Sequence, residues 1–567
     1  MSVGLSSVLP FLLLLQPVPR PAEKAPLPYR WAMVRTQLES DGDVEKIRGI
    51  AETAASHGLN GILLGAGLDT LDALRPERQR RLQAVRRICS ERHLDIIPSI
   101  FTPGYGGGLL GEDRNLAEGL PVEGALFVAR DGQAILAADP PVRLRNGGFE
   151  DVREGALADF EVSGVLGRTV FQDATDVREG KVSLRLENFA SQPGESIRLG
   201  QWVKVQPRRL YRLSGQVKAR NLKASDPFGE TRFQLEVLGG DEKRPLQYEN
   251  PPLAPTDDWH RVAVAFNTWG YDKVLVSPVV AGGGEGQVWI DDLQLEEIAL
   301  VNVLRRPGTP LTVRGEANGV PYVEGKDFRY VADPLMDFHF DHPSPVLQLL
   351  PGSAIREGER LRVGFYHSVF LYNDQVPLCL AEPKAYELWN ERVRTIEALL
   401  APRAWFLNAD EHRALGTCQA CKRSGQTLGE IQADSLTRQY RMIRALNPQA
   451  EVFVWSDMFD PHHNAGTEKK WYYLTEGSFA GSWKHIPKDV NIVCWYFERR
   501  EASLKHFSSL GFKTMAGAYY DADDLSNPTA WLQSLDATPG AVGILYTTWL
   551  DKYELLGAFG DLVSGRK

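Results

Sequence analysis

The sequence predicts an α/β fold in which a (β/α)8 TIM barrel is interrupted by an inserted all-β jelly-roll sandwich. Near both ends of the 567-residue chain, short apolar runs alternate with amphipathic helical segments. That alternation is typical of a parallel sheet covered by helices. The intervening stretch shows period-two alternation with turn residues and no convincing helix, which indicates an antiparallel sandwich.

The first part of the barrel is expected over residues 27–140. RWAMVRT, GILLGAG and IIPSIF are predicted strands. The segment DVEKIRGIAETAASHGLN is a predicted helix, because apolar residues recur there at helical spacing. Its inward-facing positions are Val44, Ile47, Ala51 and Ala54. Strand, helix and strand in this order begin either a barrel or a doubly wound sheet.

The inserted sandwich is expected over residues 141–300. Runs such as VSLRLENF, LYRLSGQVKA and HRVAVAFNTW alternate apolar and polar residues, as the strands of antiparallel sandwiches do. Residues 301–360 follow with an irregular stretch that includes PGTPLTVRGEANG. We expect this stretch to be a β-rich connection back to the barrel.

The remainder of the barrel is expected over residues 361–567. Its predicted strands are LRVGFYHSVF, AWFLNADE, EVFVWSDMF, NIVCWYFE, TMAGAYYD and AVGILYTTW. With the three early strands they make nine candidates, which is one more than the barrel holds. Either IIPSIF or RVGFYHS is therefore an extra strand, or the insertion divides a single region around the third strand.

Residues 1–26 are predicted to be a signal peptide or a disordered leader. The apolar stretch at residues 8–18 is too short to span a bilayer, and a Pro-rich segment follows it. We therefore expect a secreted or periplasmic protein that is not an integral membrane protein. The net charge of −9 and the lack of a Lys/Arg run argue against nucleic acid as a partner.

Five cysteines are too few, and odd in number, for a disulfide scaffold. Only Cys418 and Cys421 form a pattern, and a lone CxxC is half of a zinc site. His412, His462 and His463 are candidates to complete that site, but their spacing selects none of them. A local disulfide and two free thiols are equal alternatives. We therefore predict no required cofactor.

Acids and aromatic residues gather where the predicted barrel strands end. Active sites of such barrels lie just past the C-terminal ends of the strands. Indole and phenol rings stack on the apolar faces of sugars, and carboxylates bind their hydroxyls. The positions therefore predict a pocket for an oligosaccharide or glycoconjugate. Its residues are Arg35, His367, Asp410, Glu411, Trp455, Asp457, Trp495, Tyr496, Tyr519, Asp521, Tyr546 and Trp549.

The adjacent carboxylates Asp410 and Glu411 follow the strand AWFLNA directly. Neighbouring residues of an extended strand point to opposite sides, so both side chains can face one pocket only if the strand has ended there. A glycosidase needs a protonated carboxyl for the departing oxygen and an ionised one to stabilise developing positive charge. A pair that merely caps a helix before HRALGTC is the structural alternative.

The run EPKAYELWNERVRTIEALLAPRAWFLNADE resembles the segment that leads into the catalytic Asp-Glu pair of family 20 glycoside hydrolases, the β-N-acetylhexosaminidases. The family 123 β-N-acetylgalactosaminidases use a similar pair. The resemblance implies a retaining enzyme in which Glu411 is the general acid/base and Asp410 orients the 2-acetamido group of the substrate. That group is then the nucleophile and forms an oxazolinium intermediate. Asn408-Ala409 departs from the Gly-Gly that usually precedes the pair.

The same resemblance implies roles for other residues of the pocket. Arg35 would hold sugar hydroxyls, and Asp457 would bind ring hydroxyls. A donor to the acetamide carbonyl would come from Tyr519 or Tyr546. The walls around the acetamide methyl would be Trp455, Trp495 and Trp549. The resemblance leaves open the choice between GlcNAc and GalNAc, the aglycone, exo or endo action, and the oligomeric state.

The segment from about residue 146 to 297 is similar to jelly-roll carbohydrate-binding modules of the family 4/9 type. The similarity rests on NGGFED, VSLRLEN, VQPRRLYRLSGQVKA and VWIDDLQLEE. It implies glycan binding through Trp202, Trp269 or Tyr248, or else a purely structural role. Some modules of this type hold a structural calcium ion.

Two other functions remain open from the sequence. In the first, the substrate lacks an acetamido group, Glu411 is the acid, and Glu498 or Asp521 is the partner carboxylate. In the second, the chain binds glycans without cleaving them.

Overall fold

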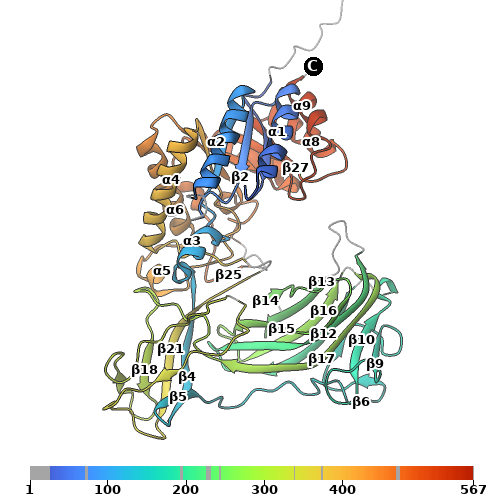
Figure 1. Cartoon of the computed structure of the whole chain (residues 1–567), viewed down its shortest axis with the longest axis vertical. Helices are drawn as coiled ribbons and strands as arrows, with labels where there is room; N and C mark the ends of the chain where they lie inside the picture. Colours follow the sequence, from blue (N-terminus) through green and yellow to red (C-terminus); the bar gives the residue numbers. More distant parts are fainter. Residues whose placement is uncertain are drawn as a thin grey trace, which may run out of the picture.

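A computed structural model describes the chain over residues 26–70, 75–191, 196–224, 232–241, 244–281, 283–337, 339–371, 375–467 and 473–565. Figure 1 shows three parts: the barrel at the top, and a sandwich and a third sheet below it. The predicted signal peptide or leader lies outside the described residues. In the described part of the chain, every helix is too short or too polar to cross a bilayer.

The barrel closes through eight parallel strands in the order β1-β2-β3-β22-β24-β26-β27-β28. Their side chains are mostly buried on both faces, as continuous apolar runs require. The closed parallel barrel expected from the sequence is therefore present. The strands are β1 (Tyr29–Arg35), β2 (Gly61–Gly65), β3 (Asp95–Ile100), β22 (Ala404–Leu407), β24 (Glu451–Trp455), β26 (Val490–Cys494), β27 (Thr514–Tyr519) and β28 (Ala541–Thr547).

Helices cover the outside of the barrel. Capping boxes start two of them, with Ser40 and Asp43 at α1 and with Thr427 and Glu430 at α6. The connection from β24 to β26 has the 3-10 turns η5 (Asp457–Phe459) and η6 (Ser482–Lys484) and, among its described residues, no α-helix. The covering helices are α1 (Asp41–Ser56), α2 (Pro76–Glu91), α4 (Pro383–Leu400), α6 (Leu428–Leu446), α7 (Arg500–Ser509), α8 (Ser526–Asp536) and α9 (Leu556–Ser564).

The sandwich consists of two antiparallel five-stranded sheets with orders β15-β12-β17-β10-β9 and β14-β13-β16-β11-β8. Alternating apolar residues from both sheets form its core, as the period-two pattern predicts. The strands are β8 (Glu161–Val162), β9 (Val170–Asp173), β10 (Ser183–Glu187), β11 (Ser196–Lys204), β12 (Leu210–Ala224), β13 (Arg232–Gly239), β14 (Pro245–Glu249), β15 (Asp257–Asn267), β16 (Lys273–Ala281) and β17 (Gly283–Ile298).

The third part is a six-stranded sheet of order β19-β18-β21-β4-β5-β20. The β-rich connection expected over residues 301–360 supplies β18, β19 and β20 of this sheet, but the sequence did not predict the sheet as a separate part. β4 and β5 lie before the sandwich in the chain and the other strands lie after it. Residues 119–136 and 360–368 therefore belong to this sheet and not to the barrel, although the expected barrel ranges 27–140 and 361–567 included them. The strands are β4 (Gly119–Arg130), β5 (Gln133–Leu136), β18 (Thr312–Gly315), β19 (Pro321–Tyr322), β20 (Leu347–Gln348) and β21 (Arg360–Ser368).

The ambiguity over the ninth strand is thereby resolved. IIPSIF supplies β3 of the barrel, whereas RVGFYHS is β21, paired antiparallel with β4. The two runs also differ in pattern. Val363 and Phe365 alternate with less buried residues along β21, whereas most residues of β3 are buried.

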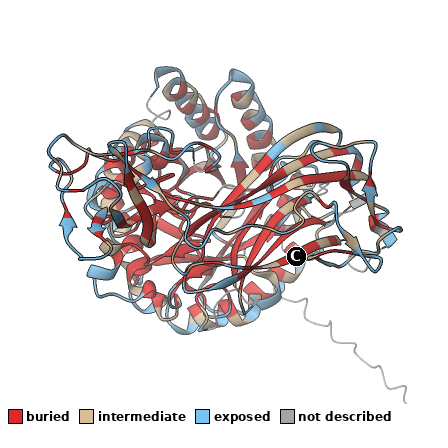
Figure 2. Cartoon of the chain, turned by 90° about the horizontal axis from the view of Figure 1, so that it is seen from below, coloured by how far each residue is buried: buried red, intermediate tan, exposed pale blue. Residues whose placement is uncertain are grey.

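The sandwich is joined to the barrel by shared core. A short parallel ribbon of β23 (Ala414–Leu415) and β25 (Leu474–Thr475) follows the Asp410-Glu411 pair. Ala414 and Leu474 are buried in the same hydrophobic cluster as the sandwich strands. Figure 2 shows that buried residues follow the strands, whereas exposed residues lie on loops and on outer helix faces.

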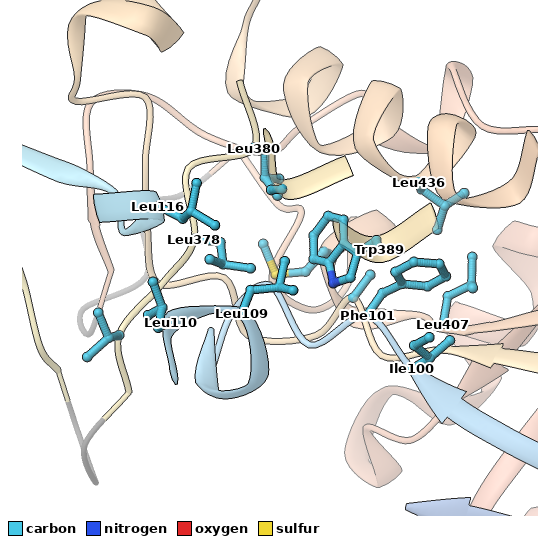
Figure 3. Close-up of a cluster of buried hydrophobic side chains, with 14 of the residues drawn as sticks. Ile100, Phe101, Leu109, Leu110, Leu116, Leu378, Leu380, Trp389, Leu407 and Leu436 are labelled. Atoms are coloured by element: carbon cyan, nitrogen blue, oxygen red, sulfur yellow. The ribbon is translucent and has the colours of Figure 1, made fainter. Parts of the chain in front are cut away.

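A second packed cluster supports the chain around the third and fourth barrel strands. Figure 3 shows Trp389 of α4 among apolar side chains from β3, from α3 (Gly107–Glu112), from β22 and from α6. The ring of Phe101 meets Trp389 edge-to-face at 5.3 Å, a favourable aromatic geometry. Phe101 and Leu407 lie where the chain leaves β3 and β22, just before the loops that carry Tyr105 and the Asp410-Glu411 pair.

Candidate active site

A cavity opens at the C-terminal end of the barrel, where the fold class places active sites. Its lining residues come from the ends of β3, β22, β24, β26, β27 and β28. They are Tyr105, Asp410, Glu411, Trp455, Trp495, Tyr520, Thr547 and Trp549. The structure thus brings together five of the residues predicted from the sequence: the two carboxylates and the three tryptophans.

Asp410 and Glu411 both reach the cavity because the strand has ended at Leu407. Glu411 has a positive φ of 45°, a conformation that non-glycine residues adopt at a cost and that clusters at functional sites. The loop after β3 crosses close to the pair at Gly104. A Cβ there would lie 2.4 Å from the carbonyl oxygen of Asp410, so only glycine fits.

Two donors hold the carboxylate of Glu411. The hydroxyl of Tyr105 donates to Oε2 at 2.5 Å, and Arg413 pairs with Oε1 at 3.1 Å. Arg413 is itself fixed by a hydrogen bond to Gln375. Because both oxygens of Glu411 are held, its carboxyl group has a defined orientation toward the cavity.

Asp410 lies deeper than Glu411. It is buried and lines the cavity, and its Oδ1 has no hydrogen-bond partner among the described residues. Burial, together with the charges of Asp457 and Glu411, raises the pKa of Asp410 well above its usual range. A buried acceptor without a donor is costly, so Asp410 is suited to accept a hydrogen bond from a ligand.

Asp457 lies beneath this pair and is fully buried. Its Oδ2 accepts hydrogen bonds from the backbone N–H of Glu411 at 2.9 Å and from Asn464 at 3.0 Å. Burial, with a contribution from the charge of Glu411, raises the pKa of Asp457 to about 7. Asp410 and Asp457, both buried in this site, do not both ionise near neutral pH, so the site retains a proton.

Aromatic rings form the walls of the cavity. Trp455 is buried and donates through Nε1 to Asn408 at 2.8 Å, so the unusual Asn408 orients a wall residue. The rings of Trp495 and Tyr520 lie parallel, with centroids 6.5 Å apart. Trp549 completes the rim and carries the Arg35 guanidinium 5.0 Å above its ring. Arg35 is thus at the rim beside the cavity.

Several predicted site residues lie elsewhere. His367 is buried on β21 and contacts Asn267 and the carbonyl of Ser368. Burial lowers the pKa of His367 to about 4, so the imidazole is neutral. His367 does not line the cavity. Tyr519 and Tyr546 are buried and stacked on each other at 4.2 Å. Tyr496 stacks on His463 and lines a neighbouring groove.

The alternative partner carboxylates are not placed to act with Glu411. Asp521 accepts hydrogen bonds from the hydroxyl of Thr548 at 2.5 Å and from the backbone N–H of Trp549 at 2.7 Å, so it holds the loop after β28. Glu498 is exposed on η7 (Phe497–Arg499). Neither residue lines the cavity.

The residues singled out in the sequence do not include four of the site: Tyr105, Arg413, Tyr520 and Thr547. Tyr105 and Arg413 lie in loops whose path depends on the whole fold. Tyr520 lies between two predicted positions, Tyr519 and Asp521, in a run of three positive φ angles that turns its ring outward. The one available signal for it was its position directly after the strand β27.

The aromatic residues proposed for glycan binding by the sandwich are mostly internal. Trp269 and Tyr248 are buried, and the guanidinium of Arg244 covers the Trp269 ring at 4.1 Å. Trp202 lies in a surface groove with Lys273 4.3 Å above its ring. Among the described sandwich residues, no three His, Cys, Asp or Glu side chains gather as a metal site, and structural calcium stays a prediction.

The histidines considered for a zinc site are not near the CxxC cysteines. His412 bonds to the carbonyl of Leu378 at 3.0 Å, and His462 and His463 line the groove next to Tyr496. Two other residues join Cys418 and Cys421 instead: Cys379 and Glu118.

Comparison with models of protein families gives no match, and comparison with curated protein sequences gives none either. Solved structures give low similarity. A glycoside hydrolase family 20 β-N-acetylglucosaminidase is 10% identical, with 96% of this chain and 71% of that chain covered and a TM-score of 0.35. A rhamnosidase from Novosphingobium sp. PP1Y is 10% identical, with 92% and 55% covered and a TM-score of 0.32.

A third solved structure is similar to a smaller part of the chain. TmCBM61 in complex with β-1,4-galactotriose is 19% identical, with 27% of this chain and 97% of that chain covered and a TM-score of 0.21. At these levels of similarity, function has to be inferred from the cavity itself.

Proposed function

We propose that this protein is a retaining glycoside hydrolase that releases β-linked N-acetylhexosamine with the help of the substrate's own 2-acetamido group. One observation carries the proposal: Asp410 lines the cavity with a buried oxygen that lacks a hydrogen-bond donor in the described part of the chain. The N–H of an acetamido group is such a donor. Glu411 lies beside it and is the more accessible carboxylate, with 21% of its side chain exposed.

In the first step, Asp410 accepts a hydrogen bond from the acetamide N–H and orients that group. The acetamide carbonyl oxygen attacks the anomeric carbon while the bond from that carbon to the leaving oxygen breaks. Glu411 gives its proton to the leaving oxygen, and the product on the enzyme is an oxazolinium ion. The nucleophile belongs to the substrate, which agrees with the absence of Glu498 and Asp521 from the cavity lining.

In the second step, water attacks the anomeric carbon from the side that the leaving group vacated. Glu411, now ionised, takes a proton from that water, and the oxazolinium ring opens to the acetamido sugar. Two inversions give net retention of configuration. Trp455, Trp495 and Trp549 shield the cation from bulk water and stack on the apolar faces of the sugar.

The carboxyl cluster supplies the proton for the first step. In the free protein, burial keeps a proton on Asp410 or Asp457. A donor from the substrate that bonds to Asp410 favours its ionised form. The proton is then available to Glu411, whose two oxygens are held in place by Tyr105 and Arg413.

Wild-type protein, Glu411→Gln and Asp410→Asn should be assayed on aryl β-GlcNAc, aryl β-GalNAc and unsubstituted β-glycosides. We expect activity only on the acetamido sugars, inhibition by a thiazoline mimic of the intermediate, and a loss of at least about 100-fold in both variants. For Glu411→Gln the loss should be smaller with a dinitrophenyl leaving group, which needs less protonation.

Glu498→Gln is the matched control, because it makes the same change on an exposed glutamate outside the cavity. It should retain wild-type rates. Equal turnover of glucosides or galactosides contradicts the acetamido mechanism. Glycan binding without turnover of any substrate contradicts enzymatic function altogether.

A further inference from the structure

Four side chains with metal-binding atoms meet in the interior, outside the active-site cavity. Cys379, Cys418, Cys421 and Glu118 are each no more than 2% exposed, and their ligand atoms all lie within 4.8 Å of one another. They come from three segments: the chain just before β4, the chain before α4, and α5 (Gln419–Arg423) with its N-cap. Cys89 and Cys494 lie outside this cluster.

The spacing of these atoms is that of a tetrahedral zinc site. Zn–S bonds of about 2.3 Å and Zn–O bonds of about 2.1 Å at tetrahedral angles separate two sulfurs by about 3.8 Å, and a sulfur from an oxygen by about 3.6 Å. Cys379 Sγ lies 3.5 Å from Cys418 Sγ and 3.7 Å from Cys421 Sγ. Cys421 Sγ lies 3.5 Å from the Oε2 of Glu118.

The carboxylate of Glu118 is oriented as a metal ligand would be. Its Oε1 accepts hydrogen bonds from the backbone N–H and hydroxyl of Thr417, at 3.0 and 2.8 Å, and from the N–H of Cys418 at 2.9 Å. Oε2 is left facing the sulfurs. Such outer hydrogen bonds position ligating carboxylates.

Packing alone does not explain the cluster. Buried cysteines are common as small hydrophobic residues, but a buried carboxylate aimed at three sulfurs is costly without a cation. Arg306 contacts Cys418. Its Nε and Nη2 donate to the carbonyls of Asn115 and Ala117, and its Nη1 lies 3.4 Å from Glu382, so all three of its nitrogens also have partners outside the cluster.

We propose that Glu118, Cys379, Cys418 and Cys421 bind a Zn²⁺ ion in a closed structural site. Four protein ligands leave no position for substrate or water, which distinguishes structural from catalytic zinc. The ion ties the start of β4 and the segment before α4 to the loop that carries Asp410, Glu411 and Arg413. It therefore fixes the catalytic loop from its far end. This proposal does not depend on which reaction the cavity performs.

The full-length protein, purified under reducing conditions without chelators, should contain one zinc ion per chain by elemental analysis. Replacement by Co²⁺ should give the thiolate-to-cobalt charge-transfer absorption and the visible bands of tetrahedral cobalt. Cys421→Ser and Glu118→Gln should lose zinc to a chelator that wild type resists. Cys89→Ser, a buried cysteine of α2 outside the cluster, should keep the full complement.

The proposal is overturned if folded wild type binds neither zinc nor cobalt after incubation with either metal. It is also overturned if mass spectrometry of the native protein finds a disulfide within the cluster, or if Cys421→Ser and Glu118→Gln retain zinc as wild type does. Should both variants fail to fold, the cobalt spectrum of wild type decides, because only thiolate ligation gives the charge-transfer bands.

Discussion

The hydroxyl of Tyr105 donates a hydrogen bond to the carboxylate of Glu411 at 2.5 Å, which links the loop after β3 to the loop after β22. Tyr105 keeps 39% of its surface exposed and lines the cavity together with Asp410 and Glu411. Burial and the charges of Asp410 and Glu411 raise the pKa of Tyr105 above its usual value of 10. The phenol therefore stays protonated and remains a donor.

Tyr105→Phe should lower kcat/KM by about 10- to 100-fold, because a hydrogen bond to a charged group contributes about 1.5–3 kcal/mol. Steady-state kinetics on the aryl acetamido glycoside would measure the loss. Tyr330→Phe, at an exposed tyrosine, is the control and should leave the rate unchanged. If both variants match wild type, Tyr105 does not orient Glu411.

Gly104→Ala should impair catalysis through the backbone of the catalytic pair. The added Cβ would meet the carbonyl oxygens of Asp410 and Glu411 at 2.4 and 2.9 Å, so the loop has to move. A displacement of about 1 Å at a catalytic group costs on the order of 100-fold in rate. Measurement of kcat together with near-UV circular dichroism separates this displacement from general unfolding.

The control for that variant is Gly49→Ala in the middle of α1, where a new Cβ meets nothing within 4 Å. It should leave kcat unchanged and stabilise the protein by roughly 0.5–1 kcal/mol, because alanine is the better helix former. A rate for Gly104→Ala that equals that of Gly49→Ala would show that the close approach does not matter.

The sequence was sufficient to predict the barrel strands and to place Asp410 and Glu411 at the cavity, because both depend on local pattern. Continuous apolar runs identify parallel strands, and the residues that follow them, such as Asp410, Glu411 and Trp455, must lie at one end of the barrel. The six-stranded sheet was missed because its strands come from both sides of the sandwich. Along RVGFYHS, buried residues alternate with less buried ones, which is typical of an antiparallel strand and not of a parallel barrel strand.

The remaining site residues depend on tertiary contacts that leave no local pattern. Tyr105 and Glu411 are 306 positions apart, and Glu118 is 303 positions from Cys421. His367 lies near the end of a strand, but that strand, β21, pairs with β4 and not with the barrel. Asp521 has the residue type and position of a catalytic acid, and only its hydrogen bonds to the Trp549 loop show its structural role.

Asp457 makes stability depend on pH. Its pKa is raised by burial to about 7 in the folded protein, against about 3.9 when unfolded. The contribution of Asp457 to the stability of the folded protein is therefore fully present below about pH 4 and is lost as the pH rises through about 7. Between pH 5 and pH 8, wild type should lose about 1–3 kcal/mol more in free energy of unfolding than Asp457→Asn.

Denaturant unfolding at both pH values would measure that difference. Asp523→Asn is the control, since the Asp523 side chain is fully exposed, and it should follow the wild-type pH dependence. If the free energy of unfolding changes equally with pH in wild type and in Asp457→Asn, the pKa of Asp457 is not raised in the folded protein.

Asp521→Asn distinguishes a structural role of Asp521 from a catalytic one. Asparagine retains one acceptor oxygen and loses the other, so the loop of Thr548 and Trp549 is held less firmly. Each lost hydrogen bond costs about 1 kcal/mol, so KM should rise roughly fivefold with little change in kcat. If Asp521 is instead the nucleophile, kcat collapses and added azide restores turnover.

Arg244→Met should show that the sandwich supports the active site. Arg244 lies between the ring of Trp269, 4.1 Å away, and the carbonyl of Thr475, to which it donates at 2.7 Å. Thr475 belongs to β25, which pairs with β23 just after Glu411. The variant leaves a part-buried carbonyl unpaired, which should cost about 1–3 kcal/mol in stability and lower kcat.

Arg220→Met is the matched control, because Arg220 also covers a sandwich tryptophan, Trp289, at 4.9 Å. It is half exposed and pairs with Asp176 of the sandwich itself. Thermal unfolding and kinetics of the two variants therefore separate loss of a cation–π contact from loss of the contact with the barrel. Equal effects of the two substitutions would mean that the sandwich is an independent module. A decline in kcat confined to Arg244→Met would mean that the β23–β25 ribbon, which follows Glu411, connects the sandwich to the active site.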